Sequence, residues 1–392
     1  MTQVHIVGGG LAGATAALKA AQTGARSITL HEMGPALGAR WSRKAGPGRA
    51  PLELADGFGP PRSILRSALA EAGVMFQDHA RTLAAISPAP GGGVCRTEGA
   101  ANPTLVCHEA EPMAVAGERL VDHINALPRN VRAPVMRFAQ WRLGGWIDDV
   151  HATGASALGL DRILPLEGRH ARPAQDPASA QTISWPTADL DTVFRAIGRR
   201  LDQLGVRLRL AETVSPAQAM ELCAEDARVL WCAPVEPLMA EAGLRPPGPA
   251  SRLKHVYTFR FPQGPAGSVL MRAFLPEGVA FAFRIIGCGT ERLLSVECAR
   301  PAEEATIRAD VARKLALLGL ASAPGELIAV ETGPDPRLPT VNGLAARQNL
   351  GVLLGRRLGG RFILAPEAGD LPCALAGLGK AAEGGWPLAL AG

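Results

Sequence analysis

The chain has 392 residues, of which 47% are hydrophobic, and it carries a formal net charge of +5 with a pI near 9.0. This length and apolar content are enough for one large domain or two ordinary ones. The positive residues are mostly arginines scattered along the chain, and no basic run resembles a nucleic-acid-binding tail, so we expect no nucleic-acid partner. Solvated arginines in a composition rich in Ala, Arg and Gly are the favoured explanation, and attraction to an anionic membrane surface stays an open alternative.

The first predicted element is a short buried strand at residues 4–7 (VHIV), which runs directly into three adjacent glycines. Gly8, Gly10 and Gly13 have the spacing G-x-G-x-x-G, and the alanine-rich residues that follow predict a helix beginning inside the glycine run. A strand, a glycine turn and a helix in this order are the context of a dinucleotide site. Gly8 permits the tight turn, Gly10 lets a pyrophosphate approach the backbone, and Gly13 lets the helix pack close to the strand. The helix N-terminus offers free N–H groups and a partial positive charge to the phosphates.

A second strand is predicted at residues 27–31 (SITLH), with Glu32 at its end. Glu32 lies 19 residues after Gly13, the separation at which a carboxylate accepts hydrogen bonds from a ribose 2′-OH. A free 2′-OH belongs to FAD or NAD and not to NADP. The alternative is a structural glycine turn beside a solvated glutamate, and the combination of strand, helix, second strand and acid makes this the weaker interpretation.

Further elements are predicted through the middle of the chain. They are a helix over 62–71, a turn-rich hairpin over 86–104, helical segments within 116–160, an amphipathic helix over 187–205, and strands at 206–214 and 226–234.

Four strand-like runs within residues 255–300 predict a meandering antiparallel sheet, which differs from the alternating strands and helices at the start of the chain. A helix is predicted over 303–320. The end of the chain returns to α/β character, with a strand that runs into an Asp-containing turn at 361–370 and a glycine-interrupted helix at 373–390.

The fold class predicted from these elements is α/β, with a Rossmann-like FAD-binding domain built from discontinuous segments and an inserted α+β substrate domain that carries the antiparallel sheet. We expect residues 1–85, 185–240 and 325–392 to form the FAD-binding domain. Residues 86–184 and 241–324 then form the substrate domain.

Seven cysteines without a C-x-x-C pair indicate neither a disulfide framework nor a zinc site, and no metal is expected. Because the first predicted strand begins at about residue 3, we expect no signal peptide. No uninterrupted apolar stretch reaches about 18 residues, the length needed to span a membrane. These features predict a cytoplasmic protein, with association at a membrane surface as the open alternative.

The order of motifs resembles the FAD-dependent amine oxidase, phytoene desaturase and protoporphyrinogen oxidase superfamily. The match is carried by "VHIVGGGLAG" with Glu32, by "LGAR" at 37–40 and "LADGFGP" at 54–60, and by "ETV" at 212–214, "LPTV" at 338–341 and "FILAPEAGDLP" at 362–372. The chain departs from the superfamily at Ala39, where a second glycine is usual, in its C-terminal segment and in its short length. Its compact length and Ala/Arg-rich composition resemble the squalene-associated branch, the hydroxysqualene dehydroxylases of hopanoid synthesis.

The resemblance implies non-covalent FAD as the cofactor. It implies an arginine near the flavin phosphates, a valine segment whose backbone meets the adenine, and a C-terminal acid at the ribityl-pyrophosphate region. The cofactor-binding residues implied by motif and resemblance are Gly8, Gly10, Leu11, Ala12, Gly13, Glu32, Met33, Arg40, Val214, Gly369 and Asp370. No catalytic residue is assigned.

The leading functional hypothesis is a flavoenzyme that transfers hydride to or from an apolar isoprenoid substrate, as a desaturase or a dehydroxylase. The chain has one tyrosine and only 4% aromatic residues, which argues against the aromatic frame that amine oxidases place around an amine. Oxidation of an amine or another small polar molecule is the second hypothesis, and a non-catalytic FAD-binding protein is the third. The first hypothesis predicts a dry cavity lined by apolar side chains of the antiparallel sheet, such as Val256, Leu270, Phe274, Phe281 and Ile285. The alternative, favoured for any single one of these residues, is that it packs against the helices over the sheet.

Overall fold

The chain divides into two compact units, each assembled from separate stretches of sequence. The first comprises Met1–Asp78, Ser184–Pro246 and Ala345–Gly392, and the second comprises His79–Ile183 and Pro247–Leu344. The computed structural model describes residues 3–22, 27–38, 64–88, 94–98, 118–127, 129–143, 147–158, 160, 182–188, 190–224, 227–244, 253–262, 268–273, 275, 277–288, 291–298, 300–320, 323–334, 338 and 340–365.

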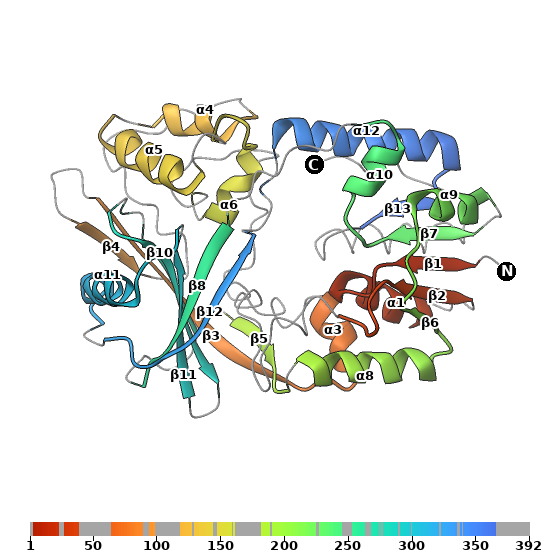
Figure 1. Ribbon diagram of the computed structural model, residues 1–392, viewed down its shortest axis with the longest axis horizontal. Helices are drawn as coiled ribbons and strands as arrows, with labels where there is room; N and C mark the ends of the chain where they lie inside the picture. Colours follow the sequence, from red (N-terminus) through yellow and green to blue (C-terminus); the bar gives the residue numbers. More distant parts are fainter. Residues whose placement is uncertain are drawn as a thin grey trace. The chain divides into compact units, whose positions relative to one another are not determined.

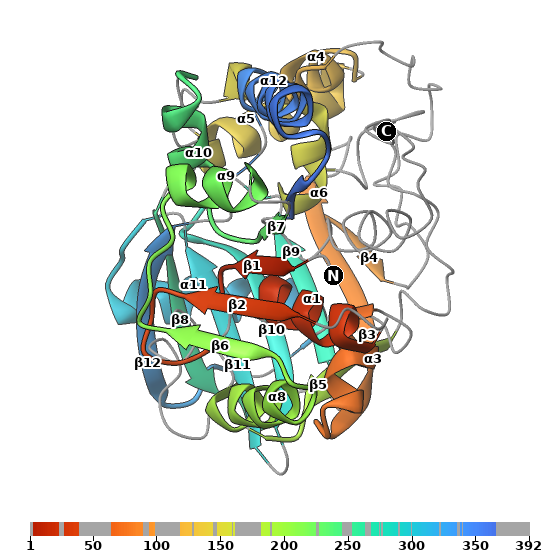
Figure 2. The ribbon, with the colours of Figure 1, turned by 90° about the vertical axis from the view of Figure 1, so that its right-hand side faces the viewer.

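A parallel sheet of five strands forms the centre of the first unit, with the strand order β13–β7–β1–β2–β6. Figure 2 shows β7, β1, β2 and β6 side by side in this order. Starting from β1, the chain extends the sheet on one side with β2 and β6 and then on the other side with β7 and β13. Dinucleotides bind outside the carboxyl ends of parallel strands at such a reversal point. The strands are β1 (Val4–Val7), β2 (Ile28–Glu32), β6 (Arg207–Leu210), β7 (Arg228–Trp231) and β13 (Phe362–Leu364).

Helices cover both faces of this sheet (Figure 1). On one face, α1 packs against β1 and β2 and against the helices α3 and α8. On the other face, Val7, Val229 and Trp231 pack with buried side chains of α9, α10 and α12. The helices are α1 (Leu11–Gln22), α3 (Ile64–Glu71), α8 (Leu190–Gln203), α9 (Pro216–Ala224), α10 (Glu236–Glu241) and α12 (Val341–Leu358).

The local sequence explains two of these helices directly. In α8 the buried positions are Leu190, Val193, Phe194, Ile197 and Leu201, which is the spacing of one helical face, and this confirms the amphipathic helix predicted over 187–205. In α1 four of the eight buried residues are alanines, whose small side chains let the helix approach the sheet closely. Helix α8 therefore forms where its apolar residues lie at helical spacing, whereas α1 is rich in helix-favouring alanines and is buried at most of its positions.

The second unit is built on a mixed sheet of eight strands, with the order β12–β8–β11–β10–β9–β3–β4 and β5 paired to β3. Adjacent strands from β12 to β9 are antiparallel, whereas β3 and β9 are parallel. The strands are β3 (Phe76–Pro88), β4 (Val94–Glu98), β5 (Thr182–Pro186), β8 (Leu253–Arg260), β9 (Ser268–Ala273), β10 (Ala280–Cys288), β11 (Glu291–Cys298) and β12 (Leu327–Pro334).

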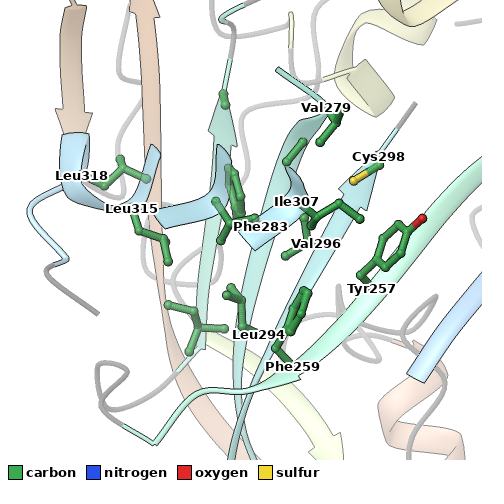
Figure 3. Packing of buried hydrophobic residues seen from close by; sticks show 14 of the residues in the cluster. Tyr257, Phe259, Val279, Phe283, Leu294, Val296, Cys298, Ile307, Leu315 and Leu318 are labelled. Carbon is green, nitrogen blue, oxygen red and sulfur yellow. The ribbon is translucent and has the colours of Figure 1, made fainter. Parts of the chain in front are cut away.

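Two groups of helices bury apolar side chains of this sheet. Helix α11 (Glu304–Leu317) lies on one face, where Ile307 and Leu315 pack with Phe259, Phe283 and other residues of β8, β10 and β11 (Figure 3). Helices α4 (Leu120–Asn125), α5 (Arg129–Leu143) and α6 (Ala155–Leu158) form a second cluster that includes residues 281 and 282 of β10.

The predicted fold class is confirmed: a discontinuous Rossmann-like unit is combined with a unit that carries an antiparallel sheet. Three details of the prediction differ from the structure. Strand β8 pairs with β11 and β12 and not with β9, so the four strands are not a simple meander. Residues 327–334, which we expected in the FAD-binding domain, form β12 of the second sheet. Helix α12 was not predicted at all.

For the two differences in the second sheet, the physical reason is that strand pairing joins segments far apart in the sequence, which local periodicity does not reveal. The predicted segment at 373–390 lies outside the described residues. Among the helices that are described, none combines the length and apolar character needed to cross a membrane.

Candidate functional site: the glycine turn and the strand ends around it

The glycine run connects β1 to α1 through a turn that needs its glycines. Gly8 has a φ of +105°, a conformation that side-chain-bearing residues rarely adopt, and its N–H donates to the carbonyl of His31 over 2.8 Å. A Cβ atom on Gly8 would come within 3.0 Å of the Cys232 backbone. A Cβ on Gly13 would overlap the carbonyl oxygen of Gly8, so the helix approaches the strand as closely as glycine permits.

Gly10 differs from its neighbours because a Cβ atom placed on it would meet nothing within 4 Å among the described residues. Within the described part of the chain, space for a side chain therefore exists at Gly10, so packing against these residues does not require glycine there. The first α-helical hydrogen bond runs from Ala14 N–H to the Gly10 carbonyl over 2.9 Å, so the N–H groups before Ala14 have no acceptor one turn back in the helix. These donors and the open space at Gly10 together suit a phosphate group.

Glu32 sits at the end of β2 with its carboxylate against the glycine turn. One carboxylate oxygen accepts the N–H of Gly9 over 2.6 Å, and the other accepts the N–H of Gly34 over 2.7 Å. An ionised carboxylate has about four acceptor positions, so two hydrogen bonds leave room for a ribose hydroxyl. The backbone thus holds the carboxylate in a fixed position beside the turn.

Gly9 is a residue of the turn that the G-x-G-x-x-G spacing did not identify, and the position of Glu32 requires it to be glycine. A Cβ atom on it would lie 2.8 Å from the Glu32 Cβ and 2.9 Å from Leu37. The side chain of Glu32 can reach the turn only because Gly9 has none. The sequence shows Gly9 as the middle one of three consecutive glycines. The need for glycine at this position follows only from the place of the Glu32 side chain in the structure.

The segment after β6 lies beside the end of β2 at the same edge of the sheet. Glu212 N–H donates to the Glu32 carbonyl over 3.0 Å, and Ala211 N–H donates to the Gly34 carbonyl over 2.8 Å. Ala211 has a φ of +54°, which is uncommon for a residue with a side chain. The backbone bonds to β2 therefore hold a sharp turn at the start of the segment that contains Val214.

The other predicted site residues of the described part occupy different environments. Leu11 is buried at the start of α1, Ala12 and Val214 are half-buried, and the side chain of Met33 is 75% exposed. Arg40, Gly369 and Asp370 lie outside the described residues. The geometry therefore brings together Gly8, Gly10, Gly13 and Glu32, whose roles in binding a cofactor remain predictions.

The second unit carries buried polar groups on the sheet face opposite α11. Arg284 and Glu297 form an ion pair with 3.1 Å between nitrogen and oxygen, and their side chains are only 10% and 4% exposed. Thr258 and Ser295 are direct cross-strand partners and are buried next to this pair. Their hydroxyl oxygens have no hydrogen-bond partner in the described part of the chain.

These positions correct the predicted lining of an apolar cavity. Val256 pairs with Glu297 and shares its face, whereas Ile285 packs into the cluster with α11 on the opposite face. Phe281 packs against Trp141 of α5, with 5.9 Å between ring centres. The residues were grouped by alternation along single strands, and a register shift between Ala280 and Ala282 breaks that alternation in β10. Phe274 and the side chain of Leu270 lie outside the description.

Comparison with known proteins supports the class of fold. Residues 6–56 match the family of NAD(P)-binding Rossmann-like domains. Curated protein sequences gave no significant match to this chain. The matched residues include the glycine turn and Glu32, which agrees with the Rossmann-like sheet of the first unit.

Solved structures are similar over nearly the whole length of the chain. Reduced UDP-galactopyranose mutase is similar with a TM-score of 0.60 and 12% identity, covering 93% of this chain and 88% of that one. Cyclohexylamine oxidase from Brevibacterium oxydans IH-35A has a TM-score of 0.53 and 16% identity, covering 97% and 99%. The CLA-producing fatty acid isomerase from P. acnes has a TM-score of 0.53 and 12% identity, covering 97% and 98%. The chain shares the overall fold of these proteins.

Proposed function

We propose that this protein is an FAD-dependent oxidoreductase. The observation that carries the proposal is the conjunction at the β1–α1 turn: open space at Gly10, helical N–H groups without an intrahelical acceptor, and the fixed carboxylate of Glu32. The carboxylate favours a cofactor with a free 2′-OH. The similarity in fold to an amine oxidase supports FAD over NAD, because the likeness extends through both units.

The residues of the turn would hold the adenosine and pyrophosphate half of the cofactor. Gly10 and the first turn of α1 would face the phosphates, and Glu32 would accept from the ribose. When bound, the flavin supplies the hydride chemistry, and the protein supplies orientation, electrostatics and exclusion of water. Met33, Arg40, Val214, Gly369 and Asp370 remain proposed contacts on the strength of the sequence resemblance.

For the substrate we propose an apolar, isoprenoid-like molecule of the kind handled by desaturases and dehydroxylases. The low aromatic content supports this choice, since 4% of residues are aromatic and there is one tyrosine. Each CH₂ group of such a substrate buried by the protein would contribute about 0.8 kcal/mol to binding. A substrate of this type also suits contact with a membrane surface, which the net charge of +5 would favour.

A small polar molecule, such as an amine, is the second candidate substrate. The hydroxyls of Thr258 and Ser295, buried beside the Arg284–Glu297 pair, favour it, because buried hydroxyls are costly unless they are hydrogen-bonded. A polar substrate could provide hydrogen bonds to these hydroxyls. An apolar substrate could not.

The test of this function is anaerobic reduction of the flavin. We expect the purified protein to be yellow and to release FAD into the supernatant on acid precipitation. A panel of amines, alcohols and polyprenyl alkenes is then mixed with the oxidised protein, and a panel of polyprenyl allylic alcohols is mixed with the dithionite-reduced protein, while the flavin absorbance is followed. A change with a polyprenyl compound supports the isoprenoid substrate, whereas bleaching with an amine supports the polar one.

Other outcomes contradict the proposal in distinct ways. A colourless protein that binds NAD would overturn the cofactor assignment. Colour that remains in the precipitate would show a covalent flavin. A yellow protein whose flavin responds to no compound in either panel, but is reduced by dithionite, would favour the non-catalytic FAD-binding alternative.

Glu32→Gln should weaken FAD binding about ten- to a hundredfold. The substitution removes a charge-assisted hydrogen bond to the ribose, worth roughly 1.5–3 kcal/mol, and it also weakens the bonds from the Gly9 and Gly34 amides. The measurement is the dissociation constant for FAD by fluorescence quenching after removal of bound flavin. Glu71→Gln, which changes a carboxylate of α3 paired with Lys19, is the matched control and should leave the constant unchanged. Equal constants for wild type and Glu32→Gln would mean that Glu32 does not contact the cofactor.

A further inference from the structure

Three side chains of the first unit are linked in series by polar contacts, on the face of the sheet away from α1. His5 Nδ1 lies 3.0 Å from His31 Nε2, and His31 Nδ1 lies 2.8 Å from Glu212 Oε1. The two imidazole rings stack with centres 5.3 Å apart. In the parallel register Val7 faces His31, so His5 and His31 project on the same side of β1 and β2.

The chemistry of the carboxylate fixes the direction of the hydrogen bond between His31 and Glu212. An ionised Glu212 can only accept, so the Nδ1–H of His31 must be the donor. Glu212 also accepts from Arg209 over 3.3 Å. Burial would raise the pKa of Glu212, but the hydrogen bonds from His31 and Arg209 outweigh it and hold that pKa below its usual value.

The same residues anchor the backbone at the proposed adenosine site. The His31 carbonyl accepts the N–H of Gly8 in the glycine turn, and the carbonyl of the next residue, Glu32, accepts the N–H of Glu212. Glu212 is therefore attached to β2 twice, through its amide and through its carboxylate. Its side chain is 37% exposed, whereas that of His31 is 7% exposed, so the histidine is the rigid partner.

We infer that His31 is a positioning residue that, through Glu212, holds residues 211–214 against the ribose-binding end of β2. The inference rests on the proposed FAD site. It assigns to His31 and Glu212 a role in affinity for the adenosine half of the cofactor, although neither needs to touch it. Without the hydrogen bond between His31 and Glu212, the turn at Ala211 should rearrange, because the positive φ of Ala211 is unfavourable and needs surrounding contacts to hold it.

The experiment uses the full chain freed of flavin, with ADP as the probe and calorimetric titration as the measurement. His31→Leu removes the donor to Glu212, and we expect ADP to bind at least tenfold more weakly. His31→Asn keeps an N–H near the position of Nδ1 and should restore affinity to within about threefold of wild type. Glu212→Leu and Glu212→Gln form a second pair at a partly exposed site, with the same expected contrast and little risk to folding. His255→Leu, which loses a 2.9 Å contact with Thr332 in the other unit, is the control and should bind ADP as wild type does.

The outcomes separate this inference from the proposed function. If the wild type binds neither ADP nor FAD, the FAD site itself is wrong. If the wild type binds both and His31→Leu and Glu212→Leu bind ADP equally well, the positioning role is wrong. If the leucine and the conservative variants lose the same affinity, the hydrogen bond between His31 and Glu212 is not what supports ADP binding, which also overturns the inference.

Discussion

Gly10→Val should yield a folded protein that purifies without flavin. The valine side chain would enter the space that a Cβ on Gly10 finds open, which is where the phosphates must approach the backbone. We expect FAD affinity to fall about a hundredfold or more, equivalent to roughly 2.8 kcal/mol. The measurements are the ratio of flavin to protein absorbance after purification and the thermal unfolding of the flavin-free protein. A variant that retains full flavin would show that the pyrophosphate does not pass Gly10.

Gly13→Ala provides the contrast for this prediction. Its Cβ would overlap the Gly8 carbonyl oxygen, so α1 would have to move away from β1. We expect a loss of about 1–3 kcal/mol in the free energy of unfolding, as for other overpacked sites. Gly10→Val should therefore lose cofactor with the fold intact, and Gly13→Ala should lose stability even without cofactor. Similar unfolding for the two flavin-free variants would contradict the different roles assigned to these glycines.

Lys314→Met should destabilise the second unit strongly. Lys314 is fully buried in α11 and lies 2.8 Å from Asp310, whose carboxylate also accepts the N–H groups of Val279 and Ala280 at the start of β10. Burial lowers the pKa of Lys314, and Asp310 only partly counters it. Removing one member of a buried ion pair costs about 3–5 kcal/mol. We expect a loss at the lower end of this range, because Asp310 keeps its contact with Arg313. The measurement is the free energy of unfolding by urea.

Arg313→Met is the matched control for this change. Arg313 also contacts Asp310, at 3.0 Å, but its side chain is 48% exposed, so we expect a loss of about 1 kcal/mol or less. If Arg313→Met lost as much stability as Lys314→Met, the exposed Arg313–Asp310 pair would contribute as much as the buried one. Equal stability of Lys314→Met and wild type would show that the buried pair contributes nothing.

The same cluster predicts a dependence of stability on pH. Burial would raise the pKa of Asp310, but hydrogen bonds from Lys314 and the Ala280 amide hold it below its ordinary value. A carboxyl with a lowered pKa in the folded state stabilises the protein above its unfolded pKa, and this stability is lost as the pH falls through the folded pKa. The loss of stability on acidification should therefore be smaller in Lys314→Met than in wild type.

The sequence by itself determined the nucleotide-binding start of the first unit. The strand at 4–7, the glycine turn, α1, β2 and the place of Glu32 are all set within one local stretch. Such a stretch can be predicted because its conformation depends on neighbouring residues. Glycines permit the turn, alanines favour the helix, and short apolar runs favour the strands. The helix α8 and most strands of the second sheet were predictable for the same reason.

Only the tertiary structure decided which distant residues meet. Glu212 reaches His31 across 181 positions of sequence and His5 reaches His31 across 26, so no local pattern marks His31 as more than a strand residue. The pairing of β12 with β8 and the polar face around Arg284 also depend on strand register, which a single shift in β10 changes. Register and long-range pairing are fixed by packing of the whole unit, because the backbone groups of each strand can pair with many partners and burial selects one.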